Sequence, residues 1–252
     1  MGEIISIVSG KGGVGKTALC ANLALALAMG DKRVVCIDCD TGLNNLDLAL
    51  GMEEKTIFDL SDVLEERCPL HKALVSHSQF RSLSLIPAAA DFRARIVPMQ
   101  LRKLCKELAA TCDFVLLDCP AGLGDGFAAA IAASDRAIVV ATPDITAIRD
   151  AGRAASLIAA EEKIPVHLVI NRMQPSFVKK GYFDNVDNIM DEIGLPLLGI
   201  LPEDEKVTVC CNRRRNLLTE KKAVSADPFR RIADRLGGKQ IPLSPLWHSR
   251  FQ

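Results

Sequence analysis

The residues best suited to chemistry lie in a glycine-rich segment near the N-terminus. Gly10, Gly15, Lys16 and Thr17 match the pattern G-x-x-x-x-G-K-[ST], and an apolar, strand-like run precedes them. The glycines let consecutive backbone N–H groups turn toward phosphate oxygens, where larger side chains would collide. We expect Lys16 to reach the β and γ phosphates of a nucleotide, and the Thr17 hydroxyl to bind Mg²⁺. The predicted phosphate-binding segment consists of Gly10, Lys11, Gly12, Gly13, Val14, Gly15, Lys16, Thr17 and Ala18.

Three aspartates follow two further apolar runs and supply the acids that a phosphate site needs. Asp38 and Asp40 come at the end of one run, and Asp118 ends another. The carboxyl ends of parallel strands form the crevice in which such sheets bind ligands. We expect one of the first two carboxylates to orient Mg²⁺ or a phosphate-side lysine and the other to position the attacking water, although a helix N-cap would explain the same pair. Asp118 is placed to hold a water of the magnesium shell, so the predicted metal site is Thr17, Asp38 and Asp118, and Gly122 in the flexible segment that follows is the expected backbone contact to the γ-phosphate.

The elements that must position these residues alternate between short apolar runs and longer helical patterns. This alternation is typical of a parallel sheet with helices on both faces. The predicted fold class is α/β, a doubly wound, mostly parallel sheet in one P-loop domain over residues 1–240, followed by a short proline-containing tail over residues 241–252. Strands are predicted at residues 4–8, 33–38, 83–86, 114–117, 137–141, 166–170 and 197–201. Helices are predicted at residues 18–29, 99–110, 126–133, 145–160, 186–193 and 228–236.

Composition sets further bounds on the class of protein. The chain has 252 residues, of which 49% are hydrophobic, so it can bury one large core. It has no run of 18 apolar residues, so we predict no membrane-spanning helix. Basic and acidic residues number 31 each, but ten basic and only three acidic ones follow residue 212. This basic C-terminal region fits either contact with an anionic surface or a solvated helical face.

The nine cysteines are expected to be packed, free thiols. The N-terminus lacks the pattern of a secretory signal, which predicts an intracellular chain with reduced cysteines. Cys36 and Cys39 have C-x-x-C spacing, but residues three apart in a strand point to opposite faces and do not easily share a metal. Cys210 and Cys211 are adjacent, with no second cluster to complete a site.

The string from Lys11 to Thr17 resembles the deviant Walker A box of the MinD/ParA family of ATPases, and the resemblance extends over about residues 2–236. It implies Mg²⁺-dependent hydrolysis of ATP to ADP and phosphate by a homodimer that forms with ATP. In that dimer Lys11 would reach the phosphates held by the other subunit. The resemblance also gives the water-positioning role to Asp40, with Asn45 nearby, so the expected catalytic residues are Lys11, Lys16, Asp40 and Asn45. It implies that adenine is flanked by Asn171, Arg172, Pro202, Glu203 and Asp204.

Within the family, four strings resemble the MinD branch more than the plasmid partition ATPases. They lie at residues 42–48, 118–122, 147–151 and 199–204. The resemblance implies a cytoplasmic protein, peripheral at the inner face of the cell membrane, that helps to place the division septum. It further implies a MinC-like division inhibitor as partner, with Asp150 as the candidate contact, and a MinE-like or other activator. One departure concerns the membrane lipid, because the branch usually ends in an amphipathic helix, whereas the comparable residues here are only Leu246, Trp247, Arg250 and Phe251.

Three alternatives remain open at this point. A ParA-like DNA-partition or polar-positioning ATPase would place the basic C-terminal region on DNA phosphates, although DNA is not the expected partner. An iron–sulfur carrier is prompted by the number of cysteines and by Gly124-Asp125, but a usable C-x-x-C near the C-terminus is missing. A scaffold protein would hold ATP without hydrolysing it.

Overall fold

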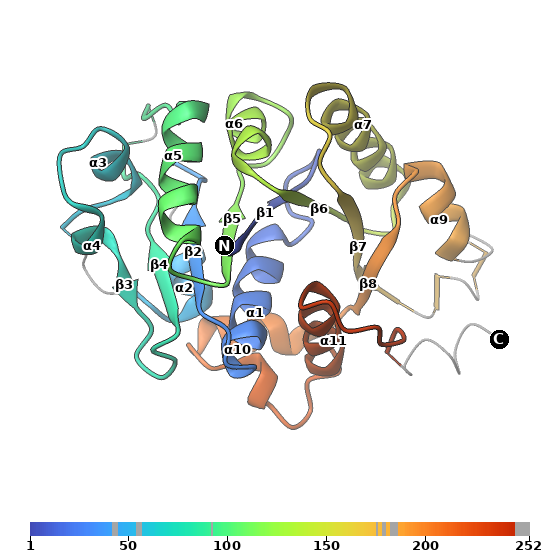
Figure 1. The fold of residues 1–252 in the computed structure, drawn as a ribbon. Coiled ribbons are helices and arrows are strands. Elements are labelled where there is room, and N and C mark those ends of the chain that lie inside the picture. The colour runs from blue at the N-terminus through green and yellow to red at the C-terminus, as the bar shows by residue number, and fades with distance from the viewer. Residues whose placement is uncertain are drawn as a thin grey trace.

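The computed structural model describes residues 1–41, 45–53, 57–91, 93–174, 176–177, 180–181 and 186–244. In this part of the chain, eight strands form one sheet with helices on both of its faces (Figure 1). The predicted α/β class is therefore confirmed.

The strands are β1 (Glu3–Val8), β2 (Val34–Asp38), β3 (Val75–Ser76), β4 (Leu83–Ile86), β5 (Phe114–Asp118), β6 (Arg136–Ala141), β7 (Val166–Met173) and β8 (Leu197–Pro202). The helices are α1 (Lys16–Met29), α2 (Leu46–Leu50), α3 (Leu60–Leu64), α4 (Leu70–Ala73), α5 (Pro98–Ala109), α6 (Asp125–Ala133), α7 (Ile145–Glu161), α9 (Val186–Ile193), α10 (Glu205–Asn212), the 3₁₀ helix η1 (Leu217–Thr219) and α11 (Ala226–Leu236).

The strand order places the acidic strand ends next to the glycine loop. The order is β3-β4-β2-β5-β1-β6-β7-β8, and each neighbouring pair is parallel except β3 with β4. In register, Asp118 of β5 is the Cα partner of Ile7 in β1 and of Asp38 in β2. The chain leaves β1 one residue beyond Ile7 and enters the loop, so both aspartates lie at the edge of the sheet from which the loop starts.

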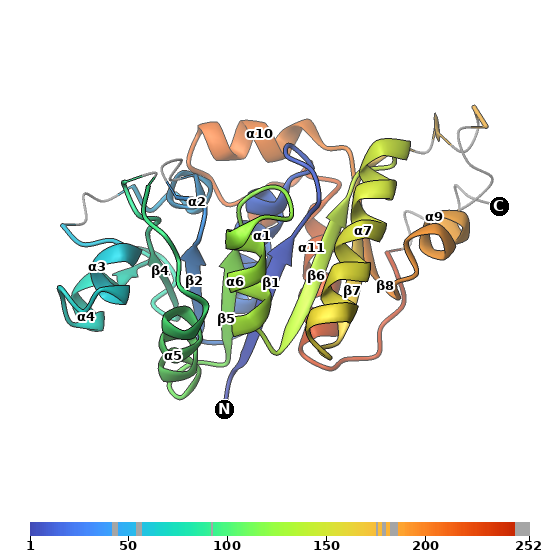
Figure 2. The ribbon, with the colours of Figure 1, turned by 90° about the horizontal axis from the view of Figure 1, so that it is seen from above.

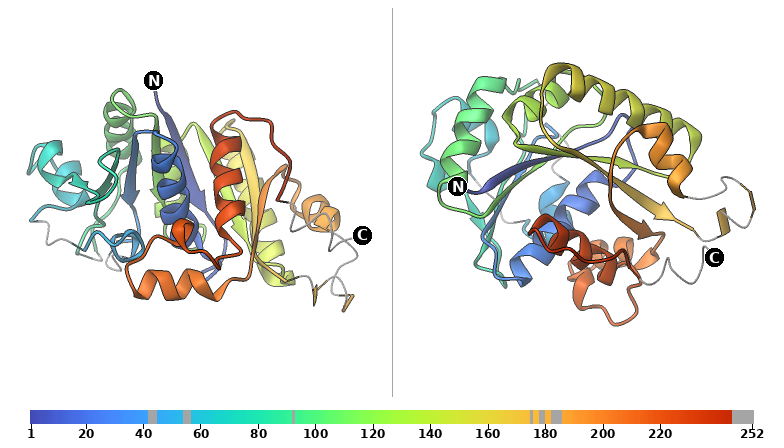
Figure 3. Two further views of the ribbon diagram at one scale, coloured as in Figure 1. Left: turned by 90° about the horizontal axis from the view of Figure 1, so that it is seen from below. Right: turned by 45° about the vertical axis from the view of Figure 1, so that its right-hand side comes forward.

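Each face of the sheet has its own apolar core. Helices α5, α6 and α7 cover one face, and α1 and α11 cover the other (Figure 2). Helix α1 is rich in alanine and leucine and is buried along most of its length, because it packs against the sheet and against α11, which lies beside it (Figure 3). The Gly30 N–H donates to the carbonyls of Ala26 and Leu27 and ends α1, as the sequence predicts.

The cysteines behave as the strand geometry predicts. Cys36 lies in the core on the α1 side of the sheet and Cys39 in the core on the opposite side. All nine cysteines are free, and only Cys211 is not buried. Burial raises the pKa of the Cys39 and Cys119 thiols well above the ordinary value, which keeps them protonated and unreactive.

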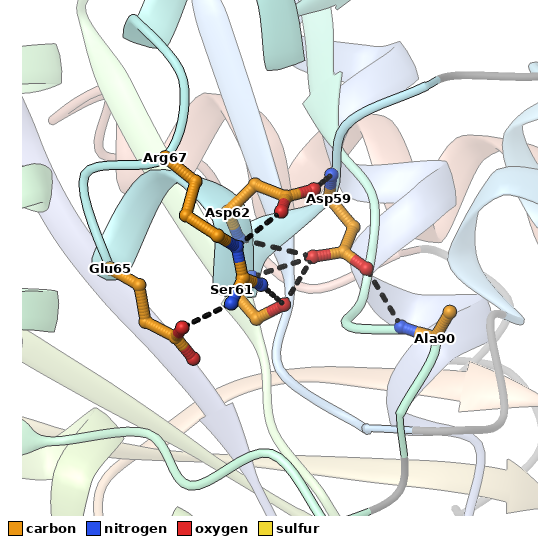
Figure 4. A network of polar contacts seen from close by, with 6 residues as sticks. All are labelled: Asp59, Ser61, Asp62, Glu65, Arg67 and Ala90. Carbon is orange, nitrogen blue, oxygen red and sulfur yellow. Dashed lines mark hydrogen bonds and ion pairs between the residues drawn. The ribbon is translucent and has the colours of Figure 1, made fainter.

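Several short elements, namely β3, α2, α3, α4, α10 and η1, are not among the predicted ones. Helix α3 illustrates the reason, because side-chain caps rather than an apolar period define it. Asp59 accepts the N–H groups of Ser61 and Asp62, and Asp62 accepts the Asp59 N–H (Figure 4). Arg67 binds Asp62 with Nε at 2.8 Å from Oδ1, and Asp59 Oδ2 accepts the Ala90 N–H at 3.0 Å. This network ties α3 to the segment that follows β4.

Beyond α11, the chain returns along the body of the protein. The Ser244 hydroxyl donates to Asp227 at 2.8 Å, and an Arg231 N–H donates to the Pro242 carbonyl at 3.3 Å. Residues 241–244 therefore lie against the body of the protein, whereas the predictions for residues 245–252 lie outside the described residues. Among the described helices, none has the length and apolar character needed to cross a bilayer.

Candidate functional site

Two glycines of the loop explain why it adopts its path. Gly15 has φ of +96°, and a Cβ there would lie 2.3 Å from Nδ2 of Asn171. Gly10 meets helix α7 so closely that a Cβ would lie 2.5 Å from the Asp150 carbonyl oxygen. Side chains at either position would push the loop away from β7 or α7. Helix α1 begins directly after Gly15, so its N-terminal N–H groups and positive dipole end face the loop.

Lys16 lies inside the loop rather than on the surface. Its side chain is buried, and its Nζ donates to the Ser9 hydroxyl at 3.1 Å. Ser9 is not among the predicted site residues, because nothing in the sequence separates it from other serines that precede a loop. The contact depends on the loop folding back over the end of β1.

Asp118 carries the most perturbed carboxyl of the site. It is buried at the end of β5, and desolvation raises its pKa to about 7, against the lowering effect of a hydrogen bond from Thr17. Its Oδ1 is buried without a hydrogen-bond partner in the described part of the chain. A buried carboxylate oxygen with a free lone pair beside a hydroxyl suits Mg²⁺ or a water in its shell, because Mg²⁺ takes oxygen ligands.

Asp38 has a structural task in addition to its place beside Asp118. Its Oδ1 accepts the Asp40 N–H at 3.0 Å and its Oδ2 accepts the Leu46 N–H, the first of α2, at 3.2 Å. Burial raises its pKa to about 6. The capping alternative is thus partly realised, since Asn45, which precedes α2, makes no side-chain cap. Asp38 retains lone pairs for a metal-bound water.

The predicted metal site offers only a few protein ligands to Mg²⁺. Thr17, Asp38 and Asp118 offer one hydroxyl and two carboxylates, and the described residues contain no group of three or more His, Cys, Asp or Glu side chains that would hold a metal ion. Mg²⁺ in nucleotide sites is usually held by one or two carboxylates together with phosphate oxygens and water. The three residues therefore fit a metal that arrives with a nucleotide.

We expect Asp118→Asn to stabilise the nucleotide-free protein at alkaline pH, by about 1–3 kcal/mol. The folded-state pKa of about 7 lies above the ordinary 3.8, so this carboxyl favours the folded state at low pH and loses that contribution as the pH rises through 7. Thermal unfolding should show a larger gain for the variant at pH 8 than at pH 5. Asp191→Asn, at an exposed aspartate of α9, is the control and should show no such pH-dependent gain. Equal gains for Asp118→Asn at both pH values would contradict the burial argument.

Lys11 is anchored to its own chain at the start of α7. Its Nζ donates to the Thr146 hydroxyl at 2.8 Å and lies 3.4 Å from Oδ1 of Asp144, with both charged side chains about half exposed. Partial burial raises the pKa of Asp144. Hydrogen bonds from Thr142, Thr146 and the Ala147 N–H lower it by more, so that the pKa of Asp144 lies well below its usual range. Lys11 thus lies at the surface and bonds to α7, whereas Lys16 is buried and bonds to Ser9.

Two of the other predicted catalytic and sensing residues, Asp40 and Gly122, lie close to the same loop. Asp40 is half-buried, which raises the pKa of its carboxyl, and it is close enough to Lys16 for the ammonium to lower that pKa. Asn45 is exposed at the start of α2, and residues 42–44 between these two lie outside the described residues. Gly122 has φ of +92°, and its N–H donates to the Ser9 carbonyl at 3.2 Å. The segment after β5 is therefore bonded to the start of the loop.

The residues expected around adenine come together at a small cavity of about 50 Å³ between α1, β7, β8, α10 and α11. Asn171 holds the loop, because its Nδ2 donates to the Val14 carbonyl at 2.8 Å. Asp204 caps α10 and accepts the Ser225 hydroxyl at 2.7 Å. The cavity is lined by Gly15, Ala18, Leu19, Asn171, Arg172, Leu201, Pro202, Glu203, Asp204, Val207, Thr208, Ser225 and Phe229.

Six lining residues, Leu19, Leu201, Val207, Thr208, Ser225 and Phe229, were not predicted as site residues from the sequence. They come from β8 and from three helical segments far apart in the chain, and only the tertiary structure brings them to one cavity beside the loop. The five residues predicted to flank adenine all line this cavity.

Comparisons with known proteins agree with this geometry. A family model described as ParA: NUBPL iron-transfer P-loop NTPase matches residues 1–237. The septum site-determining protein MinD of Bacillus subtilis (strain 168) is 42% identical over 249 residues, which cover 98% of this chain and 93% of that protein. The MinC:MinD cell division protein complex of Aquifex aeolicus superposes with a TM-score of 0.89 at 38% identity, over 96% of this chain and 98% of the other. MinD complexed with Mg-ADP from Pyrococcus horikoshii OT3 gives a TM-score of 0.81 at 29% identity, over 94% and 96% of the two chains.

The match covers nearly the whole chain, including the loop, the acidic strand ends and the small cavity beside Asn171. The description of the family model mentions iron transfer, but the iron–sulfur alternative is not favoured, because the two cysteines with C-x-x-C spacing lie on opposite faces of the sheet. The chain belongs to the MinD/ParA family of P-loop ATPases, among the relatives of the septum site-determining MinD proteins.

Proposed function

We propose that this protein is a MinD-like switch that binds MgATP between two copies of the chain, hydrolyses it to ADP and phosphate, and in its ATP form helps to place the division septum. The observation that carries the proposal is the register of β5 with its neighbours. It sets Asp118 beside both Asp38 and the phosphate loop, with Lys11 at the rim. A partition ATPase remains the alternative, but the similarity to MinD over 98% of the chain favours a role in division.

Each residue of the loop has a separate task in this proposal. Backbone N–H groups from Gly10 to Ala18 bind phosphate oxygens, and Lys16 neutralises the β and γ phosphates. Thr17, Asp38 and Asp118 hold Mg²⁺ and its waters, and the metal supplies positive charge on the phosphate oxygens. Asp40 orients the attacking water, with Asn45 at the entrance. Gly122 contacts the γ-phosphate with its backbone. Arg172 and its neighbours in the small cavity beside Asn171 hold adenine.

The partner surface is proposed to lie on α7. The Aquifex aeolicus structure is a complex with MinC, which supports a MinC-like inhibitor as partner here. Asp150 is half-buried and pairs with Arg153 at 3.4 Å, whereas Ile145 at the start of the same helix is 77% exposed. Because Lys11 donates to Thr146 in α7, a movement of Lys11 toward a nucleotide would break this bond and change the surface at the start of α7. A MinE-like activator is proposed by analogy with the family.

Peripheral membrane binding is proposed from charge and from the apolar residues of the tail sequence. Arg213, Arg215, Lys221 and Lys222 follow α10, and no ion pair to any of them is found among the described residues. Ser244, the last residue that the structure describes, is bonded to Asp227, and Asp227 lies only five residues after Lys222 in the chain. Basic residues next to large apolar ones suit an anionic bilayer better than DNA, because DNA offers phosphates but no apolar interior.

One experiment tests both the switch and the membrane proposal. Light scattering should show a dimer with MgATP and a monomer with MgADP, and sedimentation with anionic vesicles should show binding with MgATP only. A chain that lacks residues 241–252 should dimerise normally and bind vesicles less. A monomer under both conditions would contradict the switch, whereas equal vesicle binding with ATP, with ADP and without the tail would contradict only the nucleotide-dependent anchor.

A further inference from the structure

Ser9 is the residue at which the end of β1, the phosphate loop and the segment after β5 meet. Its side chain is 1% exposed, and its hydroxyl takes part in two hydrogen bonds. It donates to the Lys11 carbonyl at 2.7 Å and accepts from Lys16 Nζ at 3.1 Å. The Ser9 carbonyl accepts the Gly122 N–H at 3.2 Å.

The two bonds of the hydroxyl depend on each other. A serine hydroxyl has one proton and two acceptor lone pairs. Because the proton is directed to the Lys11 carbonyl, only lone pairs face Lys16, and a lone pair is what an ammonium group requires. The bond to Lys11 therefore fixes the orientation in which Ser9 receives Lys16.

Lys16 has two carboxylates close by, and its contact with Ser9 keeps it apart from them. Its charge lowers the pKa of Asp40 and of Asp118, against the larger effect of burial on each, so both carboxyls lie within electrostatic reach. The hydrogen bond of Nζ is nevertheless to the neutral Ser9 hydroxyl. An ammonium group donates three hydrogen bonds, so one bond to Ser9 leaves two for phosphate oxygens. Without the hydroxyl, the Lys16 ammonium would lose this hydrogen bond and would be left to the attraction of the two carboxylates.

We propose that Ser9 is a positioning residue, whose hydroxyl holds the Lys16 ammonium in the loop, ready for the β and γ phosphates, while it fixes the backbone at Lys11. This inference rests on the proposed nucleotide site and adds to it a residue that the loop pattern does not contain. Ser9 acts through Lys16 and touches no reacting atom itself.

The position of Ser9 permits a clean substitution. Ser9 directly follows β1 in the chain, and its carbonyl accepts the Gly122 N–H, a bond that does not depend on the side chain. Ser9→Ala therefore removes the hydroxyl alone, and Ser9→Thr restores it. Ser6→Ala is the matched control, because Ser6 is buried in β1, three residues before Ser9, and its Oγ has no hydrogen-bond partner in the described part of the chain.

The test is MgADP binding by titration calorimetry, with thermal unfolding of each variant alongside. Ser9→Ala should bind MgADP about tenfold more weakly than wild type, because hydrogen bonds to charged groups contribute more than neutral ones. Ser9→Thr should recover most of this loss, and Ser6→Ala should bind as wild type does. The specific readout is a double-mutant cycle with Lys16→Ala, titrated at millimolar MgADP. In that background Ser9→Ala should cause little further loss, because the partner of the hydroxyl is already gone.

Three results would overturn the role of Ser9. They are unimpaired binding by Ser9→Ala, a loss of equal size in the Lys16→Ala background, and an equal loss in Ser6→Ala. If wild type itself fails to bind MgADP, the proposed function is contradicted instead, so the two failures are distinguishable.

Discussion

Lys11→Ala is expected to leave the protein monomeric in MgATP and to lower its ATP hydrolysis by about 100-fold or more, since a cation supplied from a neighbouring subunit has effects of that size or larger in phosphoryl transfer. Within the described part of a single chain, the Lys11 ammonium bonds to Thr146 and Asp144 and not to Lys16, Thr17 or Asp118. Binding of MgATP to one chain should therefore persist. Light scattering measures dimer formation, phosphate release measures ATP turnover, and calorimetry measures MgATP binding.

Lys32→Ala is the control for this experiment. Lys32 is an exposed lysine just after α1, and its side chain makes no ion pair within the described ranges. It should dimerise and hydrolyse as wild type does. A normal ATP dimer in Lys11→Ala would reject the role across the subunit boundary and leave Lys11 as a solvated lysine held by α7.

Asp40→Ala is expected to separate hydrolysis from dimerisation. Loss of the group that orients the attacking water should lower turnover by about 100-fold or more, as is usual when an acid–base residue is removed. MgATP binding and the dimer should remain, because Asp40 makes no hydrogen bond to the loop, and its carboxylate interacts with Lys16 only through charge. The ATP dimer should also persist for longer, since its decay depends on hydrolysis.

Asp47→Ala provides the comparison, because Asp47 lies in α2, and its Oδ1 accepts the N–H of the next residue, Leu48. It should retain wild-type turnover. Unchanged turnover in Asp40→Ala would move the water-positioning role elsewhere or favour a scaffold that holds ATP without hydrolysis. Opposite effects on the dimer in Lys11→Ala and Asp40→Ala would show that the two residues act at different stages.

Local patterns were enough to predict the phosphate loop and the fold class. Gly10, Gly15, Lys16 and Thr17 are contiguous, and the strand and helix that flank them form from nearby residues, so the spacing alone implies the geometry. Strands covered by helices on both faces are continuous apolar runs in the sequence. Such runs, alternating with helical patterns, predict a parallel sheet. The opposite orientations of Cys36 and Cys39 follow from strand periodicity for the same reason.

Other parts of the site required the tertiary structure. Asp118 pairs in register with Asp38 only because β5 lies between β1 and β2, an order that no local pattern contains. The small cavity beside Asn171 is lined by residues of α1, α10 and α11, which only the tertiary structure brings together. Helix α3 depends on side-chain caps rather than on an apolar period.

The glycine-rich loop shows the same division within a few residues. By itself the sequence predicted that Lys16 and Thr17 face phosphate, and it showed that Lys11 is an additional lysine. Only the tertiary structure decided that Lys11 rests on Thr146, more than 130 residues away, and that Ser9 holds Lys16. The physical reason is that backbone geometry in a short motif depends on its own residues, whereas the partners of its side chains depend on which distant segments the sheet order brings alongside.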